Sequence, residues 1–148
     1  MKLELMVANR LTEIERVNHA FNHFARQNGF PDEVRRKINL VIDELLNNII
    51  NYAFGDRNQH LIQVQFVYKD PDLILEVTDD GVPFDLLSRP VVDVHQPIEE
   101  REVGGLGIHL IRQIMDDLQY VRAHQKNTTT LIKNIRQLRK NDYEDQNH

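Results

Sequence analysis

The stretch Gly104-Gly105-Leu106-Gly107 lies directly before a segment in which apolar residues recur at helical spacing. Glycines let successive backbone N–H groups converge on an anion, and the N-terminus of a helix adds a favourable dipole. The tetrapeptide does not fit the dinucleotide pattern Gly-x-Gly-x-x-Gly, and it is not a P-loop because no Gly-Lys-Ser/Thr follows. It indicates either a phosphate-binding loop of another type or an ordinary flexible loop end.

A second stretch, Glu44-Leu45-Leu46-Asn47-Asn48, lies in a predicted helix that opens at Pro31-Asp32 and carries apolar residues as far as Tyr52. Glu44 and Asn48 are four residues apart, so both lie on one face of that helix. Asn48 offers a neutral oxygen of the kind that Mg²⁺ binds, and Glu44 can accept the proton of an attacking hydroxyl. An exposed polar stripe has the same spacing, so both interpretations stay open.

The third stretch, Asp79-Asp80-Gly81, follows a predicted strand over residues 73–78. A carboxylate and a glycine after a strand often mark a simple turn. Alternatively, Asp79 accepts a hydrogen bond from the amino group of an adenine, and Gly81 lets the backbone approach the base because it has no Cβ.

In order and spacing, these three stretches resemble the Bergerat-type (histidine-kinase-like) ATP-binding fold. Within it, they are most similar to the bacterial anti-sigma factor serine/threonine kinases of the RsbW/SpoIIAB type. Residues 44–54 resemble the N-box of that family, with Tyr52 where a basic residue or histidine is usual. Asp79 matches the adenine-reading aspartate of an Asp-x-Gly-x-Gly motif whose second glycine is Pro83 here. This departure resembles the Asp-Asp-Gly-x-Pro-Phe sequence that the anti-sigma-kinase branch often carries.

The resemblance implies the cofactors ATP and Mg²⁺, with Glu44 as the catalytic base and Asn48 as the metal ligand. Residues 84–103 would form a lid over the nucleotide, Arg101 would reach the γ-phosphate, and Thr130 would support the adenine-binding aspartate. The expected nucleotide-binding residues are Asn48, Asp79, Gly81, Arg101, Gly104, Gly105, Leu106, Gly107 and Thr130.

The rest of the pattern predicts the order β-α-α-β-β-loop-α-β-β. Short turns join most successive strands, so we expect a mixed, mostly antiparallel sheet with three helices on one face, an α/β (α+β) two-layer sandwich. Thr12-Glu13-Ile14-Glu15 predicts a capping box at the first helix, and Gln125-Lys126-Asn127 predicts the turn of a closing hairpin. The domain should span residues 1–135, with a polar, flexible tail at 136–148.

Composition narrows the class of partner. The net charge of -5 argues against binding to nucleic acid, and no apolar run is long enough to span a membrane. The sequence has no cysteine, which excludes thiolate metal sites, and its first residues do not form a signal peptide. We therefore expect a cytoplasmic protein whose partner is another protein.

The function that the resemblance implies is an anti-sigma factor that phosphorylates a small anti-sigma-factor antagonist and regulates transcription by partner switching. Its partners would be that antagonist and a sigma factor or an equivalent regulator, and it would form a homodimer as family members commonly do. An alternative is an ATP-gated protein-binding module without kinase activity. The catalytic half of a histidine kinase is disfavoured because no dimerisation helices with a phosphoacceptor histidine precede the domain. An ATP-driven clamp would need a transducer domain that 148 residues do not hold.

Overall fold

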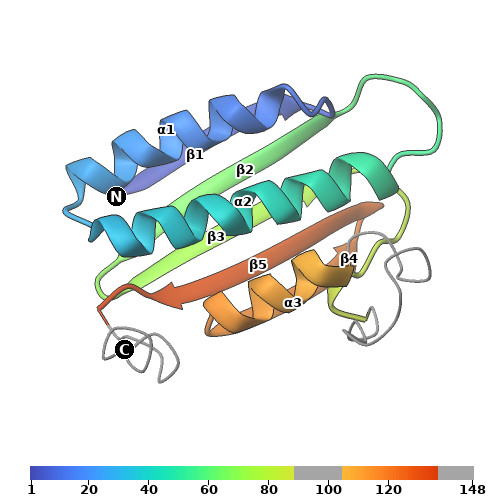
Figure 1. Ribbon diagram of the computed structural model, residues 1–148. Coiled ribbons are helices and arrows are strands. Elements are labelled where there is room, and N and C mark those ends of the chain that lie inside the picture. The colour runs from blue at the N-terminus through green and yellow to red at the C-terminus, as the bar shows by residue number, and fades with distance from the viewer. Residues whose placement is uncertain (89–104, 137–148) are drawn as a thin grey trace.

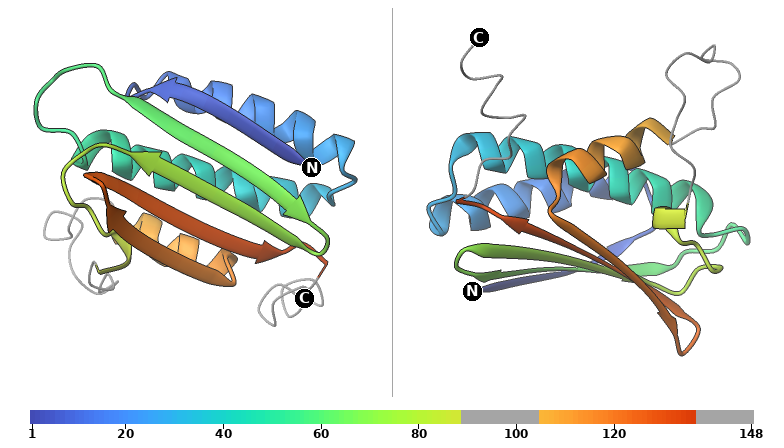
Figure 2. Two further views of the ribbon diagram at one scale, coloured as in Figure 1. Left: turned by 180° about the vertical axis from the view of Figure 1, so that it is seen from behind. Right: turned by 90° about the horizontal axis from the view of Figure 1, so that it is seen from below.

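Three helices pack on one face of a five-stranded antiparallel sheet in the computed structural model, which describes residues 1–88 and 105–136 (Figure 1). The right-hand view of Figure 2 shows all three helices on the same side of the sheet, with no described helix on the other side. This is the expected two-layer α+β sandwich, and the predicted element order is confirmed. The elements are β1 (Lys2–Ala8), α1 (Glu13–Gln27), α2 (Asp32–Tyr52), β2 (Leu61–Lys69), β3 (Asp72–Asp79), the 3₁₀ turn η1 (Leu86–Ser88), α3 (Gly105–Ile114), β4 (Asp117–Ala123) and β5 (Lys126–Asn134).

The strand order is β1-β2-β3-β5-β4, and every neighbouring pair is antiparallel. A mixed, mostly antiparallel sheet was expected, and the described strands form a sheet that is antiparallel throughout. Because β5 lies between β3 and β4, the last residue of β3 pairs with the second residue of β5, which joins Asp79 to Asn127.

The core forms where the alternating side chains of the sheet meet the apolar stripes of the helices. Along β3 every second residue is buried, and β5 repeats the alternation. Since successive side chains of a strand point to opposite faces, this pattern separates a helix-facing side from an open side. Phe21 of α1 and Phe66 of β2 meet in the core with ring centroids 4.9 Å apart. Packing on the helix-facing side therefore fixes the positions of the side chains that are buried there.

Two local expectations are wrong. Thr12 has helical backbone angles and makes no capping hydrogen bond through its side chain. Instead, the carboxylate of Glu13 accepts hydrogen bonds from the backbone N–H of Ala8 and from Arg16, which ties α1 to the end of β1. The closing hairpin turns at His124 and Gln125, whose φ angles are 53° and 63°, as in the two-residue type I′ turn.

Part of the expected domain organisation lies outside the described residues. Of the expected lid, residues 84–88 are described and residues 89–103 are not; of the tail, only residue 136 is described. Among the described helices, none is both long enough and apolar enough to cross a membrane.

Candidate active site

Asn48 carries a buried oxygen that has no hydrogen-bond partner among the residues that the structure describes. Its side chain is only 2% exposed, and its Nδ2 donates to the backbone oxygen of Glu44 at 2.6 Å. Its Oδ1 is buried, and no donor from the described residues reaches it. Buried polar atoms nearly always have a partner, so a lone one indicates a group that binds there. A neutral oxygen in this state fits a hard cation such as Mg²⁺, which prefers oxygen ligands.

Glu44 lies one helical turn before Asn48, on the same face of α2. Its side chain is half-buried, and its carboxylate makes no hydrogen bond or ion pair within the described part of the chain. The preceding residue differs, because the carboxylate of Asp43 accepts a hydrogen bond from Asn18 of α1 at 2.6 Å. Within residues 1–88 and 105–136, therefore, no hydrogen bond or ion pair engages the carboxylate of Glu44.

Asp79 is a buried carboxylate with one occupied and one unoccupied oxygen. It is 4% exposed, and its Oδ1 accepts hydrogen bonds from the Gly81 N–H and from Asn127 Nδ2, both at 2.9 Å. Its Oδ2 accepts none from the described residues. Burial raises the pKa of Asp79 and the charge of Asp80 adds to this, while the two hydrogen bonds and Arg122 oppose it.

Gly81 fastens the loop after Asp79 to the end of α2. A Cβ on Gly81 would lie 2.4 Å from the backbone oxygen of Ala53, so only glycine fits without a shift. The next residue, Val82, donates its N–H to that same oxygen at 2.8 Å. Since a helix rises about 1.5 Å per residue, Ala53 lies roughly 7.5 Å along α2 from Asn48. The Asp79 loop and Asn48 thus belong to one end of the molecule.

The first turn of α3 reaches the same end. The helix begins at Gly105, so Gly105, Leu106 and Gly107 form its first turn. In Figure 1, this turn, the C-terminal end of α2 and the end of β3 all lie on the right. Arg101 and Gly104, expected to contact phosphate, lie outside the described residues.

Asn127 is a candidate site residue that the sequence did not point to. It was expected in a turn, whereas the structure places it in β5, 1% exposed and bonded to Asp79. The expected support from Thr130 is a correction: Thr130 pairs with Glu76 on the open side of the sheet, away from Asp79. Thr129 is the buried threonine on the helix-facing side. The alternation of side chains along a strand could have identified Thr129, because it puts Thr129 on the same face as Leu131.

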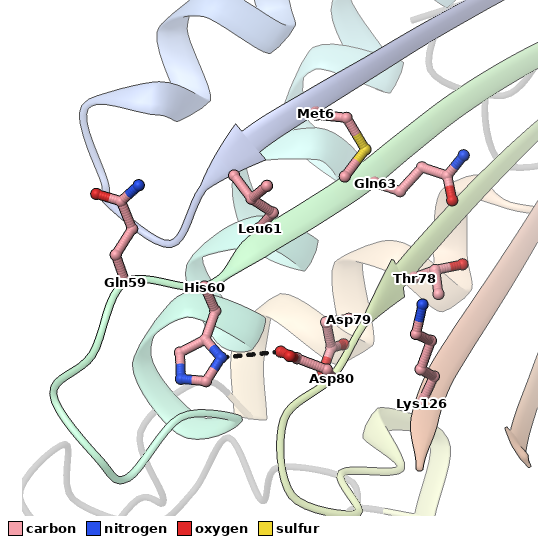
Figure 3. A pocket seen from close by; sticks show the side chains of 9 residues that line it. All are labelled: Met6, Gln59, His60, Leu61, Gln63, Thr78, Asp79, Asp80 and Lys126. Carbon is pink, nitrogen blue, oxygen red and sulfur yellow. Dashed lines mark hydrogen bonds and ion pairs between the residues drawn. The ribbon is translucent and has the colours of Figure 1, made fainter. Parts of the chain in front are cut away.

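Beside the candidate site, His60 is held between two carboxylates. Its Nδ1 lies 2.9 Å from Asp80, and its Nε2 lies 2.8 Å from Asp56. Figure 3 shows the ring of His60 and the carboxylate of Asp80 pointing toward each other, joined by this contact. The ring stacks on Phe54 with centroids 4.6 Å apart. Hydrogen bonding to Asp56, and then to Asp80, raises the pKa of His60, although partial burial opposes this.

The cavity in Figure 3 is not the nucleotide site that the sequence predicts. It has a volume of about 320 Å³ and includes Met6, Gln63 and Thr78, which pair with one another on the open side of the sheet. Asp79 and Asp80 line one end of it, but Glu44 and Asn48 do not. We therefore assign no nucleotide to this cavity.

Comparison with known proteins shows the class of domain to which this fold belongs. Residues 7–133 match the family described as the histidine kinase-like ATPase domain. The chain belongs to this family, and membership implies the use of ATP.

Two relatives with assigned names are both serine-protein kinases. The serine-protein kinase RsbW of Bacillus cereus is 28% identical over 135 residues, covering 88% of this chain and 82% of the relative. The protein of the same name from Listeria monocytogenes is 30% identical over 99 residues, which cover 64% of this chain and 63% of the relative. The chain thus spans less than two thirds of the Listeria relative.

Solved structures share the fold at low sequence identity. The RsbU and RsbW domains of Rv1364c from Mycobacterium tuberculosis match with a TM-score of 0.66 and 12% identity, covering 91% of this chain and 32% of that one. The histidine kinase domain of a blue-light-activated kinase from Erythrobacter litoralis EL346 matches with a TM-score of 0.52 and 19% identity, covering 86% and 61%. These matches support the fold alone.

Proposed function

We propose that this chain is a Mg-ATP-dependent serine/threonine protein kinase that acts as an anti-sigma factor. Two neighbouring groups on α2 carry the proposal: the buried Oδ1 of Asn48 and the carboxylate of Glu44 one turn earlier, neither of which has a partner in the part of the chain that the structure describes. A purely structural polar stripe would be exposed and solvated, whereas Asn48 is buried.

The adenine end of the proposed site consists of Asp79 and Gly81. The Oδ2 of Asp79, which no donor from the described residues reaches, accepts the amino group of adenine. Gly81 remains our assignment beside the base, although the space that its missing Cβ leaves is taken by the backbone of Ala53. Thr129 replaces Thr130 as the threonine that we assign to this end, since it shares the buried face with Asp79. Arg101 and residues 104–107 remain our assignment for the phosphates.

The phosphate end of the proposed site lies around α2. Asn48 would hold Mg²⁺ through its Oδ1, and the ion supplies charge neutralisation for the transferring phosphoryl group. Glu44 takes the proton of the substrate serine as its oxygen forms a bond to the γ-phosphorus and the bond to ADP breaks. Positioning and charge stabilisation account for most of the rate of phosphoryl transfer, so one base and one metal ligand suffice.

The substrate we propose is a small anti-sigma-factor antagonist protein, and the second partner is a sigma factor or an equivalent regulator. The relatives named serine-protein kinase RsbW support serine as the acceptor. Phosphorylation of the antagonist would then regulate transcription by partner switching, with the chain acting as a homodimer.

A transfer experiment tests the proposal. The protein is incubated with Mg²⁺ and ATP labelled on the γ-phosphate in a bacterial lysate, and the labelled protein is captured and its modified residue identified. We expect label on a serine of one small protein, and no label with the Glu44→Gln variant. Nucleotide-dependent capture of a partner that never becomes labelled would instead identify an ATP-gated binding module.

A further inference from the structure

Asn127 lies beside Asp79 at the end of the sheet. The two residues pair directly between β3 and β5, and both are buried on the helix-facing side. The hydrogen bond from Asn127 Nδ2 to Asp79 Oδ1 is therefore shielded from water, which makes it stronger than an exposed one.

Hydrogen bonds engage both the NH₂ group and the oxygen of the Asn127 side-chain amide. Its Nδ2 donates to Asp79 and to the backbone oxygen of Val82 at 2.8 Å. Its Oδ1 accepts from the Tyr120 hydroxyl, from Arg122 Nη1 at 3.2 Å and from the backbone N–H of Phe84 at 3.4 Å. Rotating the amide by half a turn would place its oxygen against two other oxygens and its NH₂ group against three donors. The orientation that presents N–H to Asp79 is thus fixed.

These hydrogen bonds also determine which carboxylate oxygen of Asp79 remains for a ligand. Asn127 and Gly81 both donate to Oδ1, so the oxygen left for a ligand is Oδ2. Hydrogen bonds to the ionised form favour that form. An ionised carboxylate only accepts hydrogen bonds, so Oδ2 suits the amino group of adenine and repels the carbonyl oxygen that guanine has at the same place.

We propose that Asn127 is a positioning residue that sets the base specificity of the nucleotide site by holding Asp79 as an acceptor-only carboxylate with Oδ2 free. This inference rests on the proposed function, because it requires that Asp79 contact the base. The charges that also act on Asp79 are those of Asp80, the residue after β3, and Arg122 of β4. Arg122 donates to the backbone oxygen of Gly81 at 2.7 Å, so it belongs to the same network.

Removal of Asn127 has a specific expected effect. Burial already raises the pKa of Asp79, and the hydrogen bond from Asn127 is the largest influence that opposes it. Without this amide, the Asp79 carboxyl loses one of the two donors that fix its orientation and favour its ionised form, so Oδ2 is no longer held as an acceptor for the base. A variant should therefore lose affinity for adenine nucleotides and lose discrimination against guanine nucleotides.

The test compares the dissociation constants of ADP and GDP by calorimetric titration. Asn127→Leu keeps a similar volume without the amide, and Tyr120→Phe is a milder variant that removes one donor to Asn127. The matched control is Thr128→Val, the next residue on the strand, whose side chain lies on the open side of the sheet. Circular dichroism and thermal unfolding establish that each variant is folded.

We expect wild type and Thr128→Val to prefer ADP by the same factor. Asn127→Leu should weaken ADP binding by about 10- to 100-fold, the range for a charge-assisted hydrogen bond, and bring the GDP/ADP ratio towards one. Tyr120→Phe should shift the ratio in the same direction by a smaller factor. An unchanged ratio in a folded Asn127→Leu or Tyr120→Phe protein overturns the inference and leaves the proposed function standing. If wild type binds neither nucleotide, the proposed function falls and the inference falls with it.

Discussion

Gly81 and Ala53 touch backbone to backbone, with a Cβ position on Gly81 only 2.4 Å from the Ala53 oxygen. The same oxygen accepts the N–H of Val82. The contact joins the loop that carries Asp79 to the last turn of the helix that carries Asn48. The two ends of the candidate site are therefore held at a fixed separation by one close approach.

Gly81→Ala should separate these two segments. The added methyl group meets backbone rather than a flexible side chain, so we expect a loss of about 1–3 kcal/mol in the free energy of unfolding, as for overpacked cores. Chemical denaturation measures this loss. Gly55→Ala is the control, because no atom lies within 4 Å of a Cβ placed there. Equal stability of the two variants would show that the loop at Gly81 can move away from Ala53 at little cost in free energy.

Asp79→Asn should uncouple stability from nucleotide binding. Since the folded-state pKa of Asp79 is raised, its ionised form is disfavoured in the fold, and its contribution to stability falls as pH rises above its ordinary value near 3.8. A neutral amide does not have this penalty. We expect the variant at pH 7.5 to melt at the same temperature as wild type or higher, and to lose this advantage as the pH is lowered towards 4. Thermal unfolding across this range is the measurement.

The same Asp79→Asn variant should bind ADP about 10- to 100-fold more weakly, as expected when a charge-assisted hydrogen bond is lost. Titration calorimetry compares it with wild type at pH 7.5. A variant that is destabilised but binds ADP normally would mean that Asp79 is a structural residue of the loop.

The pattern of apolar residues predicted most of the fold because it reports local geometry. The alternation along β2 and β3, and the stripe of α2 from Val34 to Ile49, each require only one face to be buried. The capping box failed for a different reason. The carboxylate of Glu13, the first residue of α1, accepts hydrogen bonds from Ala8 and Arg16, so another set of local contacts forms at the start of the helix in place of the capping box.

The candidate site was only partly predictable. Glu44, Asn48 and Asp79 could be found because spacing and a motif mark them. Asn127 could not, because its role depends on β5 lying between β3 and β4, a pairing across 48 residues. Thr130 was chosen from the resemblance among three consecutive threonines, and a difference of one residue along a strand moves a side chain to the other face.

His60 should make the stability of this end of the protein depend on pH. Its pKa is raised from 6.5, so its stabilising contribution is complete below that value and is lost as the pH rises through the folded-state pKa. The pKa of Asp56 is lowered, so its contribution is lost only as the pH falls below about 3.8. The ion pairs of His60 with Asp56 and Asp80 therefore contribute fully between about pH 3.8 and pH 6.5.

The measurement is the fall in melting temperature from pH 6 to pH 9, which should be smaller in His60→Gln than in wild type. His23→Gln, at an exposed histidine of α1, is the control and should behave as wild type. If His60→Gln retains the full pH dependence, the ring is neutral in the folded protein and the contacts with Asp56 and Asp80 are weak.

The final prediction separates a kinase from a binding module by two residues one helical turn apart. Asn48→Ala removes the buried Oδ1, so it should weaken Mg-ATP binding and abolish phosphoryl transfer with it. Glu44→Gln keeps the shape of the side chain but cannot take a proton. It should bind ATP nearly as wild type does, whereas transfer should fall by roughly 10²–10⁴, the range for a lost general base.

Asp43→Asn is the matched control for Glu44→Gln, because Asp43 is the neighbouring acid and is occupied by Asn18. It should leave both binding and transfer near wild type. Calorimetry with ATP and Mg²⁺, and transfer of labelled phosphate to the captured substrate, give the two readings for each variant. If Glu44→Gln and Asn48→Ala both fail to bind ATP, Glu44 is not the base but part of the binding site. If Glu44→Gln releases and captures partners as wild type does while Asn48→Ala does not, the nucleotide acts as a gate and the chain is a binding module.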